Sequence, residues 1–254
     1  MTTDLAGLAD EAVAVARAAG DLTLRWFRSA DLAVERKADG TAVTAADRAA
    51  ERHVREHLAA HHPDDAIVGE EEGRQAGSSE RQWFIDPIDG TAGFVRGVPL
   101  YSTLVAVCDA AGVAVGVIHL PALQTSVWAC RGGGCWVDGA RAQVSTVSTL
   151  GEGMITTSGY DAFTPAQLLA VRGTGAALRT WGDGYGYYLV ATGHAEAMID
   201  PVASPWDLAP MGVIMAESGG RFSAVDGRAG HDLGSGLGTN GLVHHEAIGA
   251  MAAS

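Results

Sequence analysis

The chain has 254 residues, of which 47% are hydrophobic and 19% are charged, so it can bury the core of one large domain or two small ones. Its formal net charge of −13 argues against nucleic acid or an anionic membrane surface as the main partner, because both attract a basic face. No apolar run approaches the roughly 18 residues that span a bilayer. We therefore expect a globular protein that binds neither nucleic acid nor membranes.

The N-terminus and the cysteines predict a cytoplasmic location. Three acidic residues precede Arg17, the first basic residue, which is the reverse of the order in a signal peptide. The cysteines, Cys108, Cys130 and Cys135, are odd in number and lack CxxC spacing. This pattern favours reduced thiols over a disulfide framework.

The first half of the chain reads as two helices followed by strands. Apolar residues recur at helical spacing from Leu5 to Trp26, which predicts an amphipathic helix over about the first 28 residues. After a short extended piece and a turn at Ala38 to Gly40, the segment TAAD, Thr44 to Asp47, has the form of a capping box and predicts a helix to about residue 60. Strands are then predicted at residues 66–69, 83–85, 101–107, 113–120, 126–130 and 135–139.

The second half mixes helices and strands. We expect helices at residues 166–171, around 186–193 and at 207–218, the last ended by Gly219 and Gly220, with a strand at 195–200. This order predicts a layered α/β (α+β) fold rather than strict βαβ alternation. We treat residues 1–254 as one catalytic unit with subdomains of roughly 1–147 and 148–254.

The stretch DPIDGT, residues 86–91, carries two carboxylates three residues apart. Its proline, glycine and aspartates are also typical of a surface turn. However, the apolar run at residues 81–85 would deliver Asp86 to a strand end, a common position for functional residues. A tight turn there could aim Asp86, Asp89 and the Ile88 carbonyl into one space, an arrangement that suits hard cations.

Other carboxylates have a structural interpretation when taken singly. Glu70 and Glu71 follow a predicted strand in an acidic loop that solvent could surround. Asp47 lies in the capping box, and Asp207 of PWDLAP stands at a predicted helix start, where an aspartate commonly caps the helix.

The joint pattern is more specific than its parts. The segments VTAAD, GEE, DPIDGT and WD, in this order and at these separations, resemble the inositol monophosphatase superfamily of magnesium-dependent, lithium-sensitive phosphomonoesterases. The resemblance spans Lys37 to Asn240 and implies an αβαβα sandwich of the sugar-phosphatase type in a cytoplasmic homodimer. By motif position it implies two to three Mg²⁺ ions, with Mn²⁺ as a substitute, held by Glu70, Asp86, the Ile88 carbonyl, Asp89 and Asp207.

The resemblance also implies roles for the neighbouring residues. Thr91, with Asp47 behind it, would orient a metal-bound water beside Glu70, while the amides of Gly90 and Thr91 would hold phosphate oxygens. Lys37 matches a family lysine near the outer metal. Metal ions at this site would also explain how a chain of charge −13 accepts an anionic substrate, since they invert the local field.

Substrate choice is expected to lie in the second half. The stretch from Arg179 to Pro201, together with FVRGVP at residues 94–99, resembles the histidinol-phosphate phosphatase branch of the superfamily. Asp200 matches a substrate-contacting acidic position of the family, and Asp183 stands where inositol phosphatases usually have a smaller residue. Both carboxylates could pair with the positive charge of L-histidinol phosphate. The hydroxyls of inositol could donate to the same carboxylates, so these two residues alone do not distinguish histidinol phosphate from inositol phosphate.

One departure from the family pattern leaves other substrates and functions as alternatives. Ala92 and Gly93 follow DGT, where relatives commonly have polar residues, so the edge of the pocket loses polar contacts. Inositol 1-phosphate, or another sugar or aminocyclitol phosphate, is therefore an alternative substrate. A non-catalytic, metal-binding regulatory relative and an assembly partner are further alternatives, although every ligand position is filled.

Two further groups of side chains are expected to be structural. We expect His53, His57, His61 and His62 to form a solvated helix face rather than a zinc site. We expect the aromatic side chains of the second half to serve in the core or in a dimer contact rather than as a stacking platform for imidazole; these are Trp181, Tyr185, Tyr187 and Tyr188.

Overall fold

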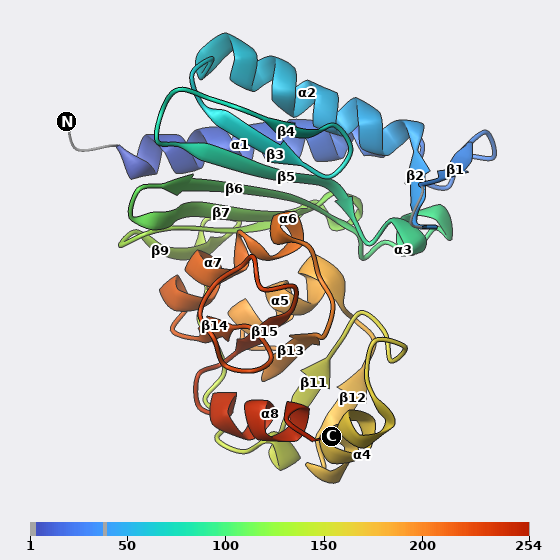
Figure 1. Ribbon diagram of the computed structural model, residues 1–254, viewed down its shortest axis with the longest axis vertical. Helices are drawn as coiled ribbons and strands as arrows, with labels where there is room; N and C mark the ends of the chain where they lie inside the picture. Colours follow the sequence, from blue (N-terminus) through green and yellow to red (C-terminus); the bar gives the residue numbers. More distant parts are fainter. Residues whose placement is uncertain (1–3, 38–39, 254) are drawn as a thin grey trace.

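The structure is a computed structural model that describes residues 4–37 and 40–253, and it forms five layers in the order α-β-α-β-α (Figure 1). The outermost helices, α1 (Leu5–Thr23) and α2 (Ala45–His61), cover one face of the first sheet. The small hairpin of β1 (Val34–Arg36) and β2 (Ala42–Thr44) precedes α2. The predicted turn at Ala38 to Gly40 lies partly outside the described residues.

The helices of the first layer form where the sequence predicts them. Leu8, Ala12, Val15 and Ala19 of α1 are buried against the sheet, as the helical spacing requires. The α1 helix ends at Thr23, earlier than expected, and turns continue from residue 24 to 28. The capping box that opens α2 is present, so this prediction is confirmed.

The first sheet has eight strands in the order β10-β9-β8-β7-β6-β5-β3-β4. Only β3 and β5 pair in parallel, and every other neighbouring pair is antiparallel. The strands are β3 (Ala66–Gly69), β4 (Gly73–Gln75), β5 (Gln82–Asp89), β6 (Ser102–Asp109), β7 (Gly112–Leu120), β8 (Thr125–Cys130), β9 (Gly134–Val137) and β10 (Ala140–Arg141). A short helix, α3 (Thr91–Val95), follows β5 directly.

A middle layer of helices separates the two sheets (Figure 1). It contains α5 (Asp183–Ala191), α6 (Pro205–Leu208) and α7 (Met211–Glu217). The prediction of a single helix at residues 207–218 is wrong, because the helix is interrupted at Ala209 and Pro210. Proline has no amide proton and its ring crowds the preceding turn, so Pro210 begins α7 instead of continuing α6.

The second sheet has five strands in the order β12-β11-β13-β15-β14. Its strands are β11 (Met154–Thr156), β12 (Ala177–Arg179), β13 (Ala197–Asp200), β14 (Arg221–Ser223) and β15 (Gly236–Thr239). The outer helices α4 (Pro165–Gly173) and α8 (His244–Met251) share a hydrophobic cluster with this sheet. The layered α/β fold expected from the sequence is therefore confirmed. No helix among the described residues has the length and apolar character needed to cross a membrane.

Candidate active site

β5 presents Asp86 and Asp89 through an irregular ladder. Asp86 pairs with Leu104 of β6 and Asp89 pairs with Ser102, so three residue steps on β5 oppose two on β6. In a regular strand, residues three apart point to opposite faces, and one extra residue restores them to one side. The prediction that Asp86 lies at a strand end is wrong, because β5 continues through this bulge to Asp89.

Glu70 and Asp207 reach the same place from other elements. The Glu70 amide donates to the Ile85 carbonyl at 3.2 Å, which extends the parallel pairing of β3 with β5 and sets Glu70 beside Asp86. Asp207 lies in the first turn of α6, where its Oδ2 accepts from the Ser204 amide at 2.8 Å. Asp207 is therefore both a helix cap and a member of the carboxylate group.

Burial and, after it, mutual repulsion set the pKa values of this group. Burial raises the pKa of Asp86 well above its usual range, and the charges of Glu70, Asp89 and Asp207 raise it further. Burial also raises the pKa of Asp89 strongly and that of Asp207 to about 6. Asp86 is only 2% exposed and Asp89 8%.

A hard cation fits this donor set. Within residues 4–37 and 40–253, no lysine, arginine or histidine forms an ion pair with Asp86, Asp89 or Asp207. Buried carboxylates without a cationic side chain are stabilised by a metal ion, and an all-oxygen set suits Mg²⁺ or Mn²⁺. The Ile88 carbonyl accepts from the Thr91 hydroxyl at 2.9 Å and keeps a second lone pair.

Lys37 is a cation at the edge of the group. Its Nζ lies 2.7 Å from Glu70 Oε1 and 2.7 Å from Glu71 Oε1. Burial alone would lower the pKa of Lys37, but the two carboxylates raise it, so the ammonium stays charged. The same burial raises the pKa of Glu71 to about 7.

Thr91 and Asp47 form a hydrogen-bonded pair at the start of α3. The Thr91 hydroxyl lies 3.4 Å from Asp47 Oδ1 as well as 2.9 Å from the Ile88 carbonyl, and both are acceptors for its proton. Asp47 is fully buried, and its Oδ2 accepts from the Thr44 amide at 2.8 Å. The capping box therefore fixes Asp47, and Asp47 in turn directs Thr91.

Glycines allow Asp183 to enter the site. Gly90 has a φ of +85°, and a Cβ there would lie 2.8 Å from Asp183 Oδ2. At Gly184, whose amide donates to Asp89 Oδ2, a Cβ would lie 2.3 Å from Ser102 Oγ. Asp183 itself has a φ of 54°, a region that aspartate tolerates better than most residues. This loop thus brings Asp183 against the carboxylate group.

Ser158 connects the two aspartates expected to contact substrate. Its Oγ donates to Asp200 Oδ1 at 2.7 Å and accepts from the Asp183 amide at 2.9 Å. Burial raises the pKa of Asp200 to about 7. Ser158 was not predicted from the sequence, although it follows the end of strand β11, a common position for functional residues.

Five of the predicted site residues line a cavity of about 990 Å³. Glu70, Gly90, Thr91, Asp183 and Asp200 line it together with Ala92 and Gly93. Asp89 and Asp207 line a smaller cavity of about 90 Å³ that shares Asp183 and Asp200 with the larger one. Arg36 and Arg96 also line the large cavity, and no local sequence pattern predicts them.

The aromatic side chains near this cavity are mainly structural. Tyr187 is buried in the cluster between the sheets, and Tyr185 and Tyr188 pack against that cluster with their rings stacked. The expected packing role is confirmed for these three. Trp181 is 41% exposed, with the Arg179 guanidinium over its ring.

The five-layer fold and the buried carboxylate group beside a large cavity define a metal-dependent phosphatase. The chain belongs to the inositol monophosphatase family, which it matches over residues 4–253. The histidinol-phosphatase of Mycobacterium tuberculosis is 40% identical over 246 residues, covering 93% of this chain and 95% of that protein. The resemblance inferred from the sequence motifs is thereby confirmed.

Solved structures agree with this assignment. The inositol monophosphatase of Thermotoga maritima superposes with a TM-score of 0.88 at 29% identity, covering 95% of each chain. An inositol monophosphatase/NADP phosphatase complexed with Mg²⁺ and phosphate has a TM-score of 0.88 at 20% identity, covering 98% of this chain and 97% of that one, a likeness of fold. The chain is thus a phosphoric monoester hydrolase that acts on small-molecule phosphate esters.

Proposed function

We propose that this phosphatase is Mg²⁺-dependent and hydrolyses L-histidinol phosphate to L-histidinol and inorganic phosphate, as a step of histidine biosynthesis. The observation that carries the proposal is the pair of acidic side chains, Asp183 and Asp200, held by Ser158 on the wall of the large cavity. Relatives named histidinol-phosphatase, at 37–40% identity, support the same substrate.

The metal ligands in this proposal are Glu70, Asp86, the Ile88 carbonyl, Asp89 and Asp207, for two to three Mg²⁺ ions with Mn²⁺ as a substitute. The carboxylates contribute four negative charges when ionised, which suits several divalent ions. Bound Mg²⁺ would neutralise the phosphate dianion, lower the pKa of the attacking water and stabilise the leaving alkoxide.

The chain's own residues would position the reactants. The Thr91 hydroxyl and the Glu70 carboxylate face the same cavity and would orient the attacking water. Asp47 would hold Thr91 in place and accept its proton at Oδ1. Gly90 precedes the first turn of α3 in a left-handed conformation, and its amide and that of Thr91 would bind phosphate oxygens.

Asp183 and Asp200 on the cavity wall would bind the positive charge of the substrate. An ammonium group beside Asp183 and Asp200 would form charge-assisted hydrogen bonds. It would also lower the pKa of Asp200 from the value of about 7 that burial imposes, because a nearby cation favours the carboxylate. Lys37 would stay near the outer metal, where it pairs with Glu70.

A second candidate substrate is inositol 1-phosphate or another sugar or aminocyclitol phosphate. The observation behind it is the departure at Ala92 and Gly93, which line the large cavity at positions where relatives commonly have polar residues. We further infer from family resemblance that the chain works as one catalytic unit in a cytoplasmic homodimer and that Li⁺ inhibits it. A mass measurement in solution and a Li⁺ titration of phosphate release test these two inferences.

Kinetics of Asp183→Asn and Asp200→Asn test the substrate assignment. Each variant should raise KM for histidinol phosphate by about ten- to a hundredfold, since the ammonium loses the negative charge of its acceptor. KM for inositol 1-phosphate should change much less. Equal effects on both substrates would contradict recognition of an ammonium group at this wall.

A further inference from the structure

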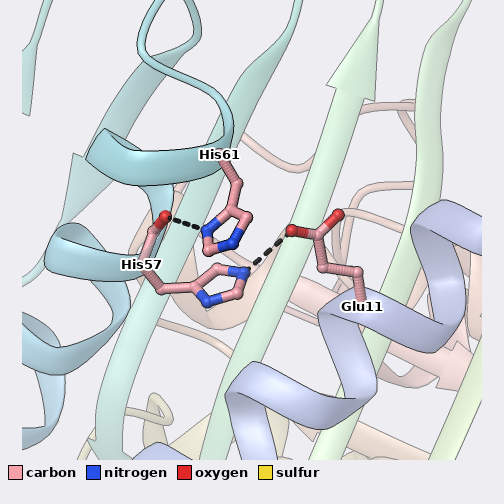
Figure 2. Close-up of side chains that lie close together, drawn as sticks. All are labelled: Glu11, His57 and His61. Atoms are coloured by element: carbon pink, nitrogen blue, oxygen red, sulfur yellow. Dashed lines mark hydrogen bonds and ion pairs between the residues drawn. The ribbon is translucent and has the colours of Figure 1, made fainter.

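A second group of metal-binding side chains lies on the opposite side of the first sheet from the middle layer, between α1 and α2 (Figure 2). Glu11 comes from α1, and His57 and His61 lie one turn apart on α2. His57 Nε2 lies 2.8 Å from Glu11 Oε1, and each of the three side chains offers a donor atom within 4.8 Å of the other two. The two imidazole rings stack with centroids 4.2 Å apart.

This arrangement differs from the solvated face expected from the sequence. The side chains of His57 and Glu11 are 29% and 26% exposed, so both are largely covered. His61 is exposed at the rim. The α1 helix supplies the third ligand from 46 positions earlier in the chain, a contact that no local pattern on α2 indicates.

Hydrogen bonds leave one nitrogen of His61 ready to bind a metal. Its Nδ1 lies 2.9 Å from the His57 backbone carbonyl, which can only accept. Nδ1 therefore carries the proton in the neutral ring, and Nε2 keeps its lone pair. A protein hydrogen bond to one ring nitrogen, with the other nitrogen free, is the usual arrangement of a metal-binding histidine.

Glu11 is oriented by a second partner. Arg81 donates to His62 Nδ1 at 3.3 Å, so His62 Nε2 carries a proton and donates it to Glu11 Oε2 at 2.8 Å. Burial by itself would raise the pKa of Glu11, but the bonds from His62 and His57 lower it, which keeps the carboxylate ionised. Oε1 is thus left facing the two histidines of α2.

We propose that Glu11, His57 and His61 bind a divalent transition-metal ion of the Zn²⁺ class and so join α1 to α2. Two imidazoles and one carboxylate form a frequent Zn²⁺ ligand set, with water in the fourth position. Ligand atoms of a tetrahedral Zn²⁺ site lie about 3.3 Å apart. His57 Nε2 and Glu11 Oε1, now 2.8 Å apart, would separate slightly as the ion replaces the proton on Nε2, which passes to solvent. His61 would move toward them by about 1.5 Å at most. The exposed His61 side chain can make that movement.

The proposed site is separate from the carboxylate group of the active site. His57 lies ten residues beyond Asp47 on α2, which corresponds to about 15 Å along the helix. The chemistry also differs, because imidazole favours Zn²⁺, Ni²⁺ and Cu²⁺ whereas Mg²⁺ prefers oxygen ligands. Saturating Mg²⁺ should therefore fill the active site and leave this one open.

Calorimetric titration with ZnCl₂ in saturating Mg²⁺ tests the proposal. The full chain should bind one Zn²⁺ with high affinity, and His61→Asn should weaken that binding at least tenfold. His53→Asn is the matched control, since His53 lies one turn earlier on α2 but outside the group. It should bind Zn²⁺ like the unmodified chain.

Thermal unfolding gives a second readout that does not depend on catalysis. Zn²⁺ should raise the Tm of the unmodified chain and of His53→Asn by several degrees, because the ion binds only the folded arrangement of α1 and α2. It should leave the Tm of His61→Asn unchanged. Equal Zn²⁺ affinity in His61→Asn and the control, or an equal Tm response, would overturn the proposal.

Discussion

Glu70 stands between the buried carboxylates and the ammonium of Lys37, and its proposed work is to bind metal and orient water. Glu70→Gln keeps the shape of the side chain but removes its charge. We expect the rate of phosphate release to fall by at least a hundredfold with little change in stability. Glu72→Gln is the matched control, since Glu72 lies in the same acidic loop with an exposed side chain. Unchanged phosphate release in Glu70→Gln would remove the proposed mechanism.

Asp200 carries a testable pH dependence. Burial raises the pKa of its carboxyl from 3.8 to about 7 in the folded protein. Its contribution to stability is therefore fully present below pH 3.8 and is lost as the pH rises through 7. Asp200→Asn removes this titration.

The metal-free Asp200→Asn protein should gain stability relative to the unmodified chain between pH 4 and 8, by about 2 to 4 kcal/mol. Denaturant unfolding in a chelating agent at several pH values measures it. If the stability difference between the two proteins stayed constant across that pH range, the raised pKa of Asp200 would be contradicted.

The short helix α3 is preceded by Gly90 in a left-handed conformation. Gly90→Ala places a Cβ at a φ of +85° and 2.8 Å from Asp183 Oδ2, so it should cost about 1 to 3 kcal/mol and displace Asp183. Phosphate release should fall with it. At Gly93 an added Cβ would meet only Val98, at 3.6 Å.

Gly93→Ala is therefore the control within the same helix. It should leave stability unchanged or raise it by up to about 1 kcal/mol, because alanine is the better helix former. Chemical unfolding and phosphate release, measured on both variants, give the comparison. If the two substitutions had the same effect, the conformation assigned to Gly90 would be in error.

Elements with a strong local signal were predictable, and those defined by distant contacts were not. The capping box of α2 and the continuous apolar runs of β6 and β7 are local signals, and all three elements form as expected. Strands of three residues such as β11 and β12 are too short for a periodic pattern. One helix was predicted at residues 207–218, whereas the missing amide proton of Pro210 separates α6 from α7.

In the site, too, local signals were predictable and contacts between distant residues were not. The apolar run at residues 81–85 located the start of β5 and the motif DPIDGT located its carboxylates, whereas the continuation of the strand to Asp89 was not predicted. The bridge from Ser158 to Asp200 joins residues 42 positions apart, and the contact of Glu11 with His57 joins residues 46 apart. Such pairs depend on how the layers pack, so the sequence alone does not reveal them.

For the molecule as a whole, the buried carboxylates make stability depend on metal. In the metal-free protein, burial raises the pKa of Asp207 to about 6 and raises the pKa values of Asp86 and Asp89 strongly, so ionising these groups costs stability as the pH rises. Mg²⁺ should therefore raise the Tm by several degrees at pH 8 and much less at pH 5. Thermal unfolding with Mg²⁺ and with a chelating agent checks this; equal shifts at the two pH values would contradict it.

The most direct test of the proposed function is phosphate release by the purified protein, with and without Mg²⁺. The substrates are histidinol phosphate, inositol 1-phosphate, fructose 1,6-bisphosphate and AMP. We predict that activity requires Mg²⁺ and that kcat/KM for histidinol phosphate exceeds each of the others by at least tenfold. Weak, even activity across the four substrates would contradict histidinol phosphate as the substrate and direct attention to the pocket edge at Ala92 and Gly93.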